Sequence, residues 1–158
     1  MKQAVFSLAI LLLALCGCSS DESIKGASNG PFSVRDVANS GCKSTSHTRS
    51  EYPEYFEFKA CDGGYLSVNH VNAMFNCAPG ELKIEATIDG NVIKILEMEE
   101  TALANCICPY DLYCEVGPLG NGDYEVVIYH NSFEIPVRKF SFTYNKVNVH
   151  FSARSPEN

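Results

Sequence analysis

The sequence predicts an all-β fold, an antiparallel sandwich of about eight short strands that is stapled by disulfide bonds. Three observations lead to this prediction. Apolar and polar residues alternate with a period of two along most of the chain after residue 50, as they do in strands with one buried face. Turn-forming residues separate the alternating stretches, and none of these stretches has the spacing of an amphipathic helix. Six of the eight cysteines lie at or after residue 42, which is typical of a disulfide framework in an exported domain.

Each expected strand places an apolar residue at every second position. The turn Asp62-Gly63-Gly64 separates the first two strands, and Asp89-Gly90 suits a tight hairpin because both central residues of a type I′ turn need positive φ. The expected inward-facing sets are, in chain order, Phe56, Phe58 and Ala60; Leu66 and Val68; Leu82, Ile84, Ala86 and Ile88; the stretch 92–98; Leu112, Cys114 and Val116; Tyr124, Val126 and Ile128; Phe140 and Phe142; and Val147, Val149 and Phe151.

One local pattern refines the fold class to immunoglobulin-like. The segment 119–126 (LGNGDYEV) resembles the E–F corner of an immunoglobulin-like sandwich, in which a tyrosine at the start of a strand hydrogen-bonds back to the preceding turn. We therefore expect Tyr124 to make this bond. The alternative is that Tyr124 is an ordinary core aromatic residue of an antiparallel sheet.

The first seventeen residues have the three parts of an export signal. Lys2 supplies the positive charge, and residues 5–15 (VFSLAILLLAL) form an apolar run too short to span a membrane, which needs roughly 20 apolar residues. Leu15-Cys16-Gly17-Cys18 resembles the lipobox of bacterial lipoproteins, in which a small residue precedes the lipid-modified cysteine. Because Cys16 follows the bulky Leu15, we expect the lipid on Cys18. The alternative is an ordinary secretory signal with two incidental cysteines.

The chain therefore divides into a lipoprotein signal peptide at 1–17, a lipidated cysteine with a flexible tether at 18–30, and a single β-sandwich domain at 31–158. Removing the signal peptide removes Lys2 and leaves 11 basic and 19 acidic residues, a net charge of −8. This acidic balance argues against a nucleic-acid partner. The residues 19–23 (SSDES) resemble acidic signals that send lipoproteins to the outer face of the outer membrane, but they are equally compatible with a solvated tether. Periplasmic and surface-facing orientations both stay open.

The cysteines that follow the anchor are expected to form disulfide bonds. We predict a bond between Cys42 and Cys61, a bond from Cys77 to either Cys106 or Cys108, and a bond from Cys114 to the remaining one of these two. The alternative is a metal or redox site on Cys106 and Cys108. Their C-x-C spacing is one residue shorter than the usual zinc spacing, and His70, His130 and His150 are not at ligand spacing.

Two segments resemble a group of small, uncharacterised Bacteroidetes lipoproteins with an immunoglobulin-like β-sandwich domain. They are residues 70–77 (HVNAMFNC) and 105–112 (NCICPYDL), with the later Leu119, Gly122, Asp123 and Tyr124. The resemblance covers about residues 66–128. It implies a β-sandwich and a lipid anchor, and it implies no activity. Ala78 stands where the group often has a second cysteine, so no disulfide pairing is carried over.

No residue set has the specificity of a catalytic motif. Ser40-Gly41-Cys42-Lys43 matches S-x-x-K by chance, because the companion motifs of penicillin-recognising enzymes are absent from the sequence. His70 continues the inward positions of Leu66 and Val68 and is expected to be a buried, hydrogen-bonded imidazole.

We therefore expect a lipid-anchored binding or accessory module of the cell envelope, without catalytic activity, cofactor or metal. Its partner would be an unidentified protein or glycan, bound by the exposed tyrosines Tyr110, Tyr113 and Tyr129 or by loops 102–110 and 117–122. The absence of tryptophan weakens the glycan alternative. The other functions considered are an envelope hydrolase with an unrecognised site and a cysteine-based metal or redox lipoprotein.

Overall fold

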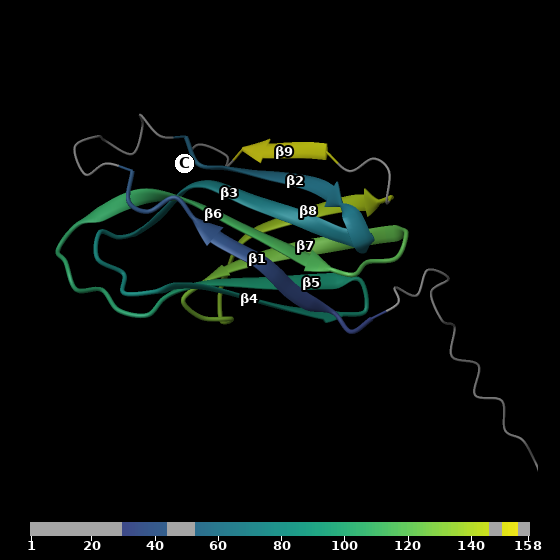
Figure 1. The fold of residues 1–158 in the computed structure, drawn as a ribbon, viewed down its shortest axis with the longest axis horizontal. Coiled ribbons are helices and arrows are strands. Elements are labelled where there is room, and N and C mark those ends of the chain that lie inside the picture. Colours follow the sequence, from purple (N-terminus) through teal and green to yellow (C-terminus); the bar gives the residue numbers. More distant parts are fainter. Residues whose placement is uncertain (1–29, 44–52, 146–149, 155–158) are drawn as a thin grey trace, which may run out of the picture.

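The computed structural model describes residues 30–43, 53–145 and 150–154 and confirms the all-β sandwich (Figure 1). The predicted signal peptide, Cys18, the tether, and Val147 and Val149 lie outside the described residues. The elements are β1 (Ser33–Asn39), β2 (Tyr55–Cys61), the short 3-10 helix η2 (Asp62–Gly64), β3 (Tyr65–Asn76), β4 (Leu82–Asp89), β5 (Val92–Glu99), β6 (Ile107–Gly117), β7 (Gly122–His130), β8 (Pro136–Tyr144) and β9 (His150–Arg154). No helix among these residues is both long and apolar enough to cross a membrane.

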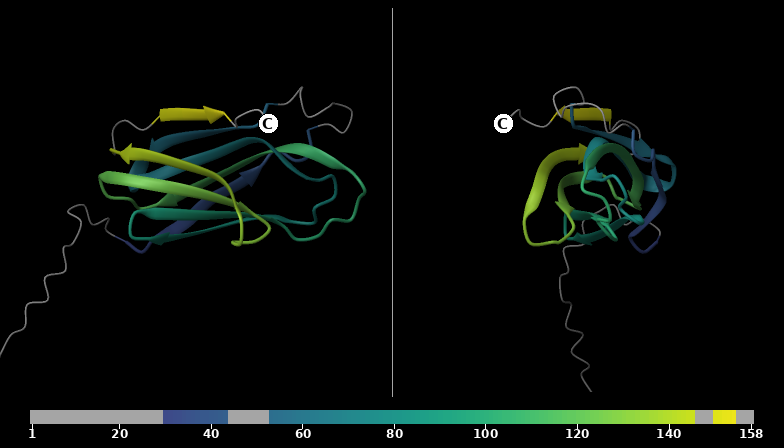
Figure 2. Two further views of the ribbon diagram at one scale, coloured as in Figure 1. Left: turned by 180° about the vertical axis from the view of Figure 1, so that it is seen from behind. Right: turned by 90° about the vertical axis from the view of Figure 1, so that its left-hand side faces the viewer.

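Two sheets pack face to face (Figures 1 and 2). The five-stranded sheet has the order β1-β6-β3-β2-β9, and the four-stranded sheet has the order β4-β5-β7-β8. All pairs are antiparallel except β5 and β7, which run parallel with Val92 opposite Glu125 and Glu97 opposite His130. This one pair departs from the predicted antiparallel pattern, because the connection through β6 crosses from one sheet to the other and returns. The immunoglobulin-like assignment stays a prediction.

The strand predictions are confirmed for most of the chain. Strand β1 was not predicted, because its sequence (SVRDVAN) carries no sustained alternation and most of its residues are exposed. The hydroxyl of Tyr124 donates a hydrogen bond to the carbonyl oxygen of Gly120 at 3.2 Å, so the predicted tyrosine bond is present.

The main core, which we call the large cluster, is formed by the inward-facing residues of both sheets. It buries the aromatic, aliphatic and sulfur-containing side chains of Phe56, Phe58, Leu66, Val68, Ile93, Ile95, Cys114, Val116, Leu119, Val126, Ile128 and Tyr144. Most of these residues are at the positions that period-two alternation predicted, because alternate residues of a strand point to the same face.

A β-bulge divides β3 and changes which residues point inward. The register between β3 and β6 shifts between His70 and Ala73, and Asn72 has a positive φ of 61°. Before the bulge the even-numbered residues face the large cluster. After it, Ala73 and Phe75 face a second, smaller group, the small cluster, which comprises Ala73, Phe75, Cys108, Tyr110 and Leu112. A bulge inserts one unpaired residue, so it reverses the alternation along the rest of the strand.

The sandwich has two ends with different connections. At the disulfide end lie segment 40–43 and the loops 77–81, 100–106 and 131–135; at the tether end lie Gly30, segment 62–64, the β4–β5 turn and segment 117–121. Ser33 pairs with Gly117, so the domain begins at the tether end. Strand β6 runs from one end to the other over about 30 Å. The two loops predicted to bind a partner, 102–110 and 117–122, therefore lie at opposite ends and do not form one surface.

Candidate functional site

A network of two histidines and two glutamates lies inside the sandwich toward the disulfide end. His70 of β3 is fully buried, and both of its ring nitrogens contact carboxylates. Its Nδ1 lies 2.8 Å from Oε2 of Glu97 on β5, and its Nε2 lies 2.9 Å from Oε1 of Glu54, just before β2. Nε2 of His130, the last residue of β7, lies 2.9 Å from the same Oε2 of Glu97. We call these four residues the His–Glu network, and it confirms that His70 is a buried, hydrogen-bonded imidazole.

Two hydrogen bonds to backbone carbonyl oxygens hold the network in place. The side chain of Asn72, in the bulge, donates to the carbonyl oxygen of Pro53 at 2.9 Å and so fixes the residue before Glu54. The backbone amide of Asn131 donates to the carbonyl oxygen of Glu97 at 2.9 Å, which fixes the end of β7 where His130 lies. The network therefore joins residues of both sheets through rigid backbone.

The contacts of His70 define its protonation state. A neutral imidazole has one N–H donor, whereas two carboxylates can both accept from the ring only when both nitrogens carry protons. Burial lowers the pKa of His70, but the charge of Glu97 and the hydrogen bonds to Glu54 and Glu97 outweigh it and raise this pKa to about 9. Burial raises the pKa of Glu97, but the charge of His70 and the hydrogen bonds from both histidines lower it to about 2. His70 is thus an imidazolium held between two carboxylates.

The network lies between the two hydrophobic clusters. The ring of His70 stacks on Phe56 of the large cluster with a centroid distance of 3.9 Å, and the ring of His130 lies 5.0 Å from Phe75 of the small cluster. His130 is 25 % exposed, whereas His70 and Glu97 are buried. The donor atoms of His70, Glu97 and His130 lie within 4.8 Å of one another, close enough for a metal ion to bind all three.

Two disulfide bonds join Cys42 to Cys108 and Cys77 to Cys106. The second bond confirms one of the predicted alternatives. The predicted bond between Cys42 and Cys61 is wrong, because Cys42 follows β1 at the disulfide end and Cys61 ends β2 at the tether end. Cys61 and Cys114 are free thiols.

Cys114 was also predicted to be in a disulfide bond, and this is wrong as well. Its side chain points into the large cluster, where burial raises the pKa of the thiol. Cys106 and Cys108 are both in disulfide bonds, so their thiolates are not available to a metal in this state. The Sγ atoms of Cys42, Cys77 and Cys108 nevertheless lie within 4.8 Å of one another, so the two disulfide bonds are neighbours.

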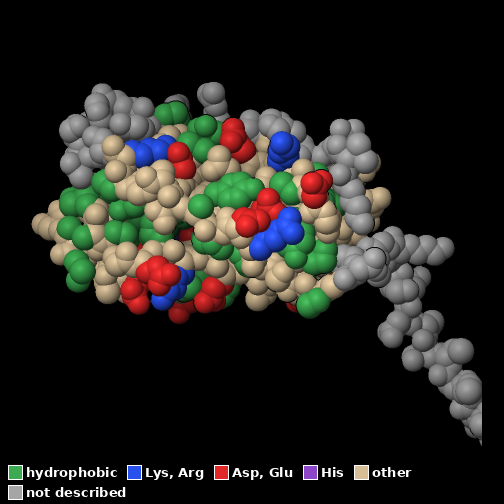
Figure 3. All heavy atoms as spheres, in the orientation of Figure 1, with side chains coloured by type: hydrophobic (Ala, Val, Ile, Leu, Met, Phe, Trp, Pro, Cys, Tyr) green, Lys and Arg blue, Asp and Glu red, His purple; other side chains and the backbone are tan. Residues whose placement is uncertain are grey.

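Large apolar side chains are exposed at the disulfide end. Leu103 and Ile135 are each 77 % exposed and Ile107 is 63 % exposed, and Phe133 is exposed in the same β7–β8 loop as Ile135. Figure 3 shows hydrophobic side chains gathered at this end, on the left of the view. We call Leu103, Ile107, Phe133 and Ile135 the apolar tip.

The three tyrosines predicted to bind a partner occupy different environments. Tyr110 is buried in the small cluster, and its hydroxyl donates to the carbonyl oxygen of Asn76 at 3.0 Å, so the predicted exposed face is wrong for this residue. Tyr110 continues the inward positions of Leu112, Cys114 and Val116, because the alternation along β6 is unbroken. Tyr113 is half-buried and donates to Oε1 of Glu115 at 2.9 Å. Tyr129 is half-buried and packs edge-on against Phe133 with a centroid distance of 5.3 Å, beside the apolar tip.

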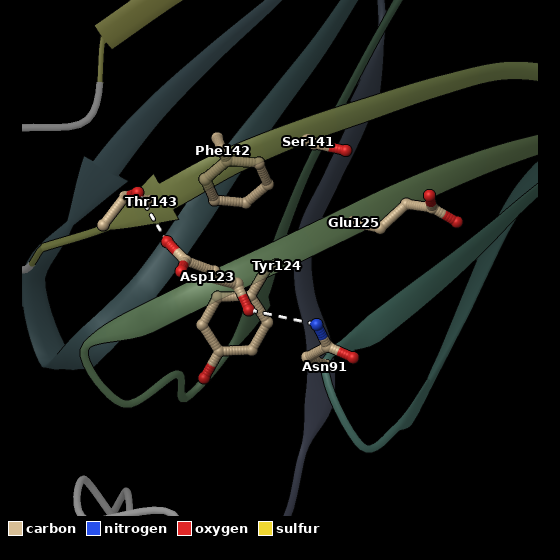
Figure 4. A pocket seen from close by; sticks show the side chains of 7 residues that line it. All are labelled: Asn91, Asp123, Tyr124, Glu125, Ser141, Phe142 and Thr143. Atoms are coloured by element: carbon tan, nitrogen blue, oxygen red, sulfur yellow. Dashed lines mark hydrogen bonds between the residues drawn. The ribbon is translucent and has the colours of Figure 1, made fainter.

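A shallow pocket of about 450 Å³ lies on the outer side of β7 and β8, toward the tether end (Figure 4). Its residues bond mainly to one another: Oγ1 of Thr143 lies 2.6 Å from Oδ1 of Asp123, and the side-chain amide of Asn91 lies 3.4 Å from the carbonyl oxygen of Asp123. The residues that line it include no histidine and no cysteine: Asn91, Asp123, Tyr124, Glu125, Ser141, Phe142 and Thr143.

The chance S-x-x-K match has a structural explanation. Nζ of Lys43 binds Oδ1 of Asn72 at 2.9 Å and also the carboxylate of Asp111, and the hydroxyl of Ser40 accepts from the backbone amide of Asp111 at 2.9 Å. Both side chains therefore fasten the end of β1 to β6.

Sequence reasoning missed Glu54, Glu97 and His130 as a group, although alternation carried a signal for two of them. Glu97 continues the inward positions of Ile93 and Ile95, and His130 continues those of Val126 and Ile128. A charged or titratable residue at an inward position of a strand needs a buried partner.

No family, curated protein or solved structure with which the chain was compared matches it.

Proposed function

We propose that the chain is an exported lipoprotein, anchored to the outer membrane through Cys18, whose β-sandwich binds a protein partner through the apolar tip without catalysing a reaction. The apolar tip carries this proposal. Three aliphatic side chains are more than half exposed at the end of the domain that lies farthest from Gly30, where the tether begins. Several exposed apolar side chains at one end of an otherwise acidic protein are typical of a binding surface.

Within the apolar tip, the loop that carries Leu103 is fastened to loop 77–81, which favours binding. Hydrogen bonds run from the backbone amide of Leu103 to the carbonyl oxygen of Ala78 at 3.2 Å and from that of Thr101 to the carbonyl oxygen of Pro79 at 2.9 Å. The bond between Cys77 and Cys106 closes the same pair of loops. A pre-organised loop loses little conformational entropy on binding, so more of the contact energy appears as affinity.

The chemistry of the surface favours a protein partner over a glycan. Its side chains are mainly aliphatic, whereas sugar rings are usually recognised by aromatic platforms, and the chain contains no tryptophan. A partner with a complementary apolar surface in the same membrane fits best, because a tethered domain meets such a partner at a high effective concentration.

The positions of the histidines and of the pocket favour binding over hydrolysis. His70 and His130 contact carboxylates, and the pocket of Figure 4 lies on the outer face of the second sheet and is lined by neither histidine nor cysteine. A serine or cysteine hydrolase needs its nucleophile within hydrogen-bond reach of a base.

Export and anchoring rest on the three-part signal, the lipobox and the disulfide bonds, which form in oxidising compartments. The resemblance of residues 66–128 to small Bacteroidetes lipoproteins also supports the proposed lipid anchor.

Site-specific photo-crosslinking of the full chain in the cells that make it tests this function. A photoreactive residue at Leu103, Ile107 or Ile135 is expected to cross-link to one and the same protein. The control is Val37, which is 48 % exposed on β1 and lies outside the apolar tip. Equal cross-linking from Val37, or cross-links only between two copies of this chain, would contradict the proposal.

The anchor is tested separately by fatty-acid labelling. Cys18→Ser is expected to abolish the label, because only a thiol can form the thioether, and to reduce cross-linking at the apolar tip through loss of local concentration. Unchanged labelling of the Cys18→Ser chain would show that Cys18 does not carry the lipid. A hydrolase assay tests the alternative function. If the chain turns over a substrate and a single Ser, His or Asp substitution abolishes this turnover, the protein is an enzyme and the binding proposal is wrong.

A further inference from the structure

The donor atoms of the His–Glu network have the composition of a transition-metal site. Two imidazole nitrogens and one carboxylate oxygen, from His70, His130 and Glu97, lie within 4.8 Å of one another. Two histidines and one glutamate are a common ligand set for Zn²⁺ and similar divalent ions. We propose that these three side chains bind one divalent transition-metal ion, with Zn²⁺ as the first candidate and Glu54 as the residue that orients His70. This site is independent of the proposed protein-binding surface.

The observed distances are close to those that metal binding needs. Ligand nitrogens and oxygens lie about 2.0–2.2 Å from zinc, so two ligands of one tetrahedral ion are about 3.3 Å apart. In the described structure the corresponding contacts from Oε2 of Glu97 are 2.8 Å to His70 and 2.9 Å to His130. The ligands must separate by about half an ångström, which a small rotation of the Glu97 side chain provides.

Glu54 is placed as an outer-shell residue of such a site. A metal-binding histidine usually donates its second ring N–H to a carboxylate, which fixes the tautomer and the orientation of the ring. His70 would bind the ion through Nδ1, and its Nε2 already lies 2.9 Å from Oε1 of Glu54. The bond from Asn72 to the carbonyl oxygen of Pro53 holds Glu54 in this position.

The ion would replace a proton. His70 would give up the proton on Nδ1 and keep the one on Nε2, and His130 would bind the ion through Nε2. Metal binding therefore releases protons, as is general for metal sites built on imidazole.

Among the described residues, His130 is the ligand that is partly open to solvent. Phe56 covers the ring of His70 and Phe75 lies beside His130, whereas His130 itself is partly exposed. An ion would enter past His130, and water would supply the fourth ligand from the same side. Because the ligands come from β3, β5 and β7, the ion would join the two sheets near the disulfide end.

The experiment uses the mature chain with Cys18→Ser, so that it stays soluble, and without a histidine tag. After chelation and removal of the chelator, the chain is titrated with Co²⁺ and with Zn²⁺. We expect one ion per chain, the intense visible absorption of tetrahedral Co²⁺, its displacement by Zn²⁺, and a higher melting temperature with either ion.

Three variants make the result specific. His130→Gln is expected to lose the visible Co²⁺ spectrum, and because His130 lies at the edge of the network, near-ultraviolet circular dichroism can verify that this variant folds. Glu54→Gln is expected to keep the stoichiometry and to bind about 10–100-fold more weakly. Glu85→Gln, on the exposed face of β4, is the control and is expected to bind normally.

Three results would overturn the site. They are the absence of saturable binding, equal binding by His130→Gln and by the control, and a thiolate-to-cobalt charge-transfer band. The last would place the ion on cysteine.

Discussion

The two ends of the sandwich are held together by different chemistry. The disulfide end has two disulfide bonds, the His–Glu network and the contacts of Lys43 with Asn72 and Asp111. At the tether end, among the described residues, there is no disulfide bond; hydrogen bonds from tyrosine hydroxyls to backbone carbonyl oxygens connect strands and turns there. Tyr144 donates to Tyr65 at 3.1 Å, and Tyr124 donates to Gly120 at 3.2 Å.

The difference follows the distribution of apolar burial. The large cluster contains most of the buried aromatic and aliphatic residues and continues to the tether end through Leu119 and Tyr144. The small cluster has only five buried members, and the ring of His130 from the His–Glu network lies beside its Phe75. Covalent bonds therefore lie where the hydrophobic contribution is smallest, just as small exported domains with limited cores depend on disulfide bonds.

Reduction of both disulfide bonds is expected to have the largest effect. Each bond should contribute about 2–4 kcal/mol to the free energy of unfolding, so reduction should lower it by roughly twice that amount. Hydrogen exchange should accelerate first in loops 77–81 and 100–106, while β7 near Gly122 stays protected. The control is Cys61→Ser, which removes a free thiol and no disulfide bond, so its free energy of unfolding should not fall by the amount that reduction removes. Thiol counting on the denatured, unreduced mature Cys18→Ser chain should find two thiols, and a count of six would contradict the disulfide assignment.

Removal of Glu97 is expected to have the next largest effect. Glu97→Leu keeps most of the side-chain volume but leaves the buried imidazolium of His70 with one carboxylate instead of two. Losing one partner of a buried ion pair lowers the free energy of unfolding by about 3–5 kcal/mol. Urea denaturation with a chelator present measures this apart from any metal effect. Glu85→Leu, on the exposed face of β4, should change stability by less than about 0.5 kcal/mol. If the two variants behave alike, the network does not hold a buried charge pair.

Two tyrosine substitutions compare equivalent bonds at the two ends. Tyr110→Phe and Tyr124→Phe each remove one hydroxyl that donates to a backbone carbonyl oxygen. We expect a loss of about 1–2 kcal/mol at the buried Tyr110 and about 0.5–1 kcal/mol at the half-buried Tyr124, because water can replace the bond at an exposed site. Melting curves of the two variants measure the difference. A larger loss at Tyr124 would mean that the tyrosine bond contributes more to the fold than its exposure implies.

The local features of the fold could be predicted from the sequence, and the long-range ones could not. Alternation identified the inward residues of β2, β4 and β7, because a strand with one buried face records its orientation in every second residue. The Tyr124 bond could also be predicted, since its acceptor lies four residues away. The disulfide bond between Cys42 and Cys108 joins residues 66 positions apart, and its pairing depends on which strands are neighbours.

The His–Glu network shows why the site itself was only partly predictable. The inward position of His70 followed from Leu66 and Val68, and its burial is confirmed. Its partner Glu97 and the His130 that contacts Glu97 come from strands of the opposite sheet, and their contact depends on the parallel pairing of β5 with β7. The bulge at Asn72 reverses the alternation after His70, and the buried apolar positions of β3 shift there from even numbers (Leu66, Val68) to odd numbers (Ala73, Phe75). Tyr110 was expected on the outside but lies inside, where it continues the inward positions of Leu112, Cys114 and Val116 on β6.

The smallest expected effect concerns pH at the tether end, where Glu115 of β6 pairs with Arg35 of β1. Nε of Arg35 donates to Oε2 of Glu115 at 2.7 Å, and the hydroxyl of Tyr113 donates to Oε1 at 2.9 Å. Burial raises the pKa of Glu115, but the hydrogen bonds from Arg35, Tyr113 and Cys61 outweigh it and hold this pKa below the ordinary value of 4.5. A carboxylate whose pKa is lower in the folded than in the unfolded chain stabilises the fold above the unfolded pKa. This contribution is lost as the pH falls through 4.5 and toward the lower folded value.

Glu115→Gln cannot titrate at this position and should remove that part of the acid dependence. The unfolding free energies of the unmodified chain and of Glu115→Gln, measured with urea from neutral pH down to about pH 4, should therefore converge as the pH falls. Their difference should also shrink in high salt, because the Arg35 side chain is 41 % exposed and its charge is screened. A difference that stays constant across this range would show that Glu115 acts through packing and hydrogen bonding alone. The charge interaction between Arg35 and Glu115 would then not contribute to the pH dependence of stability at the tether end.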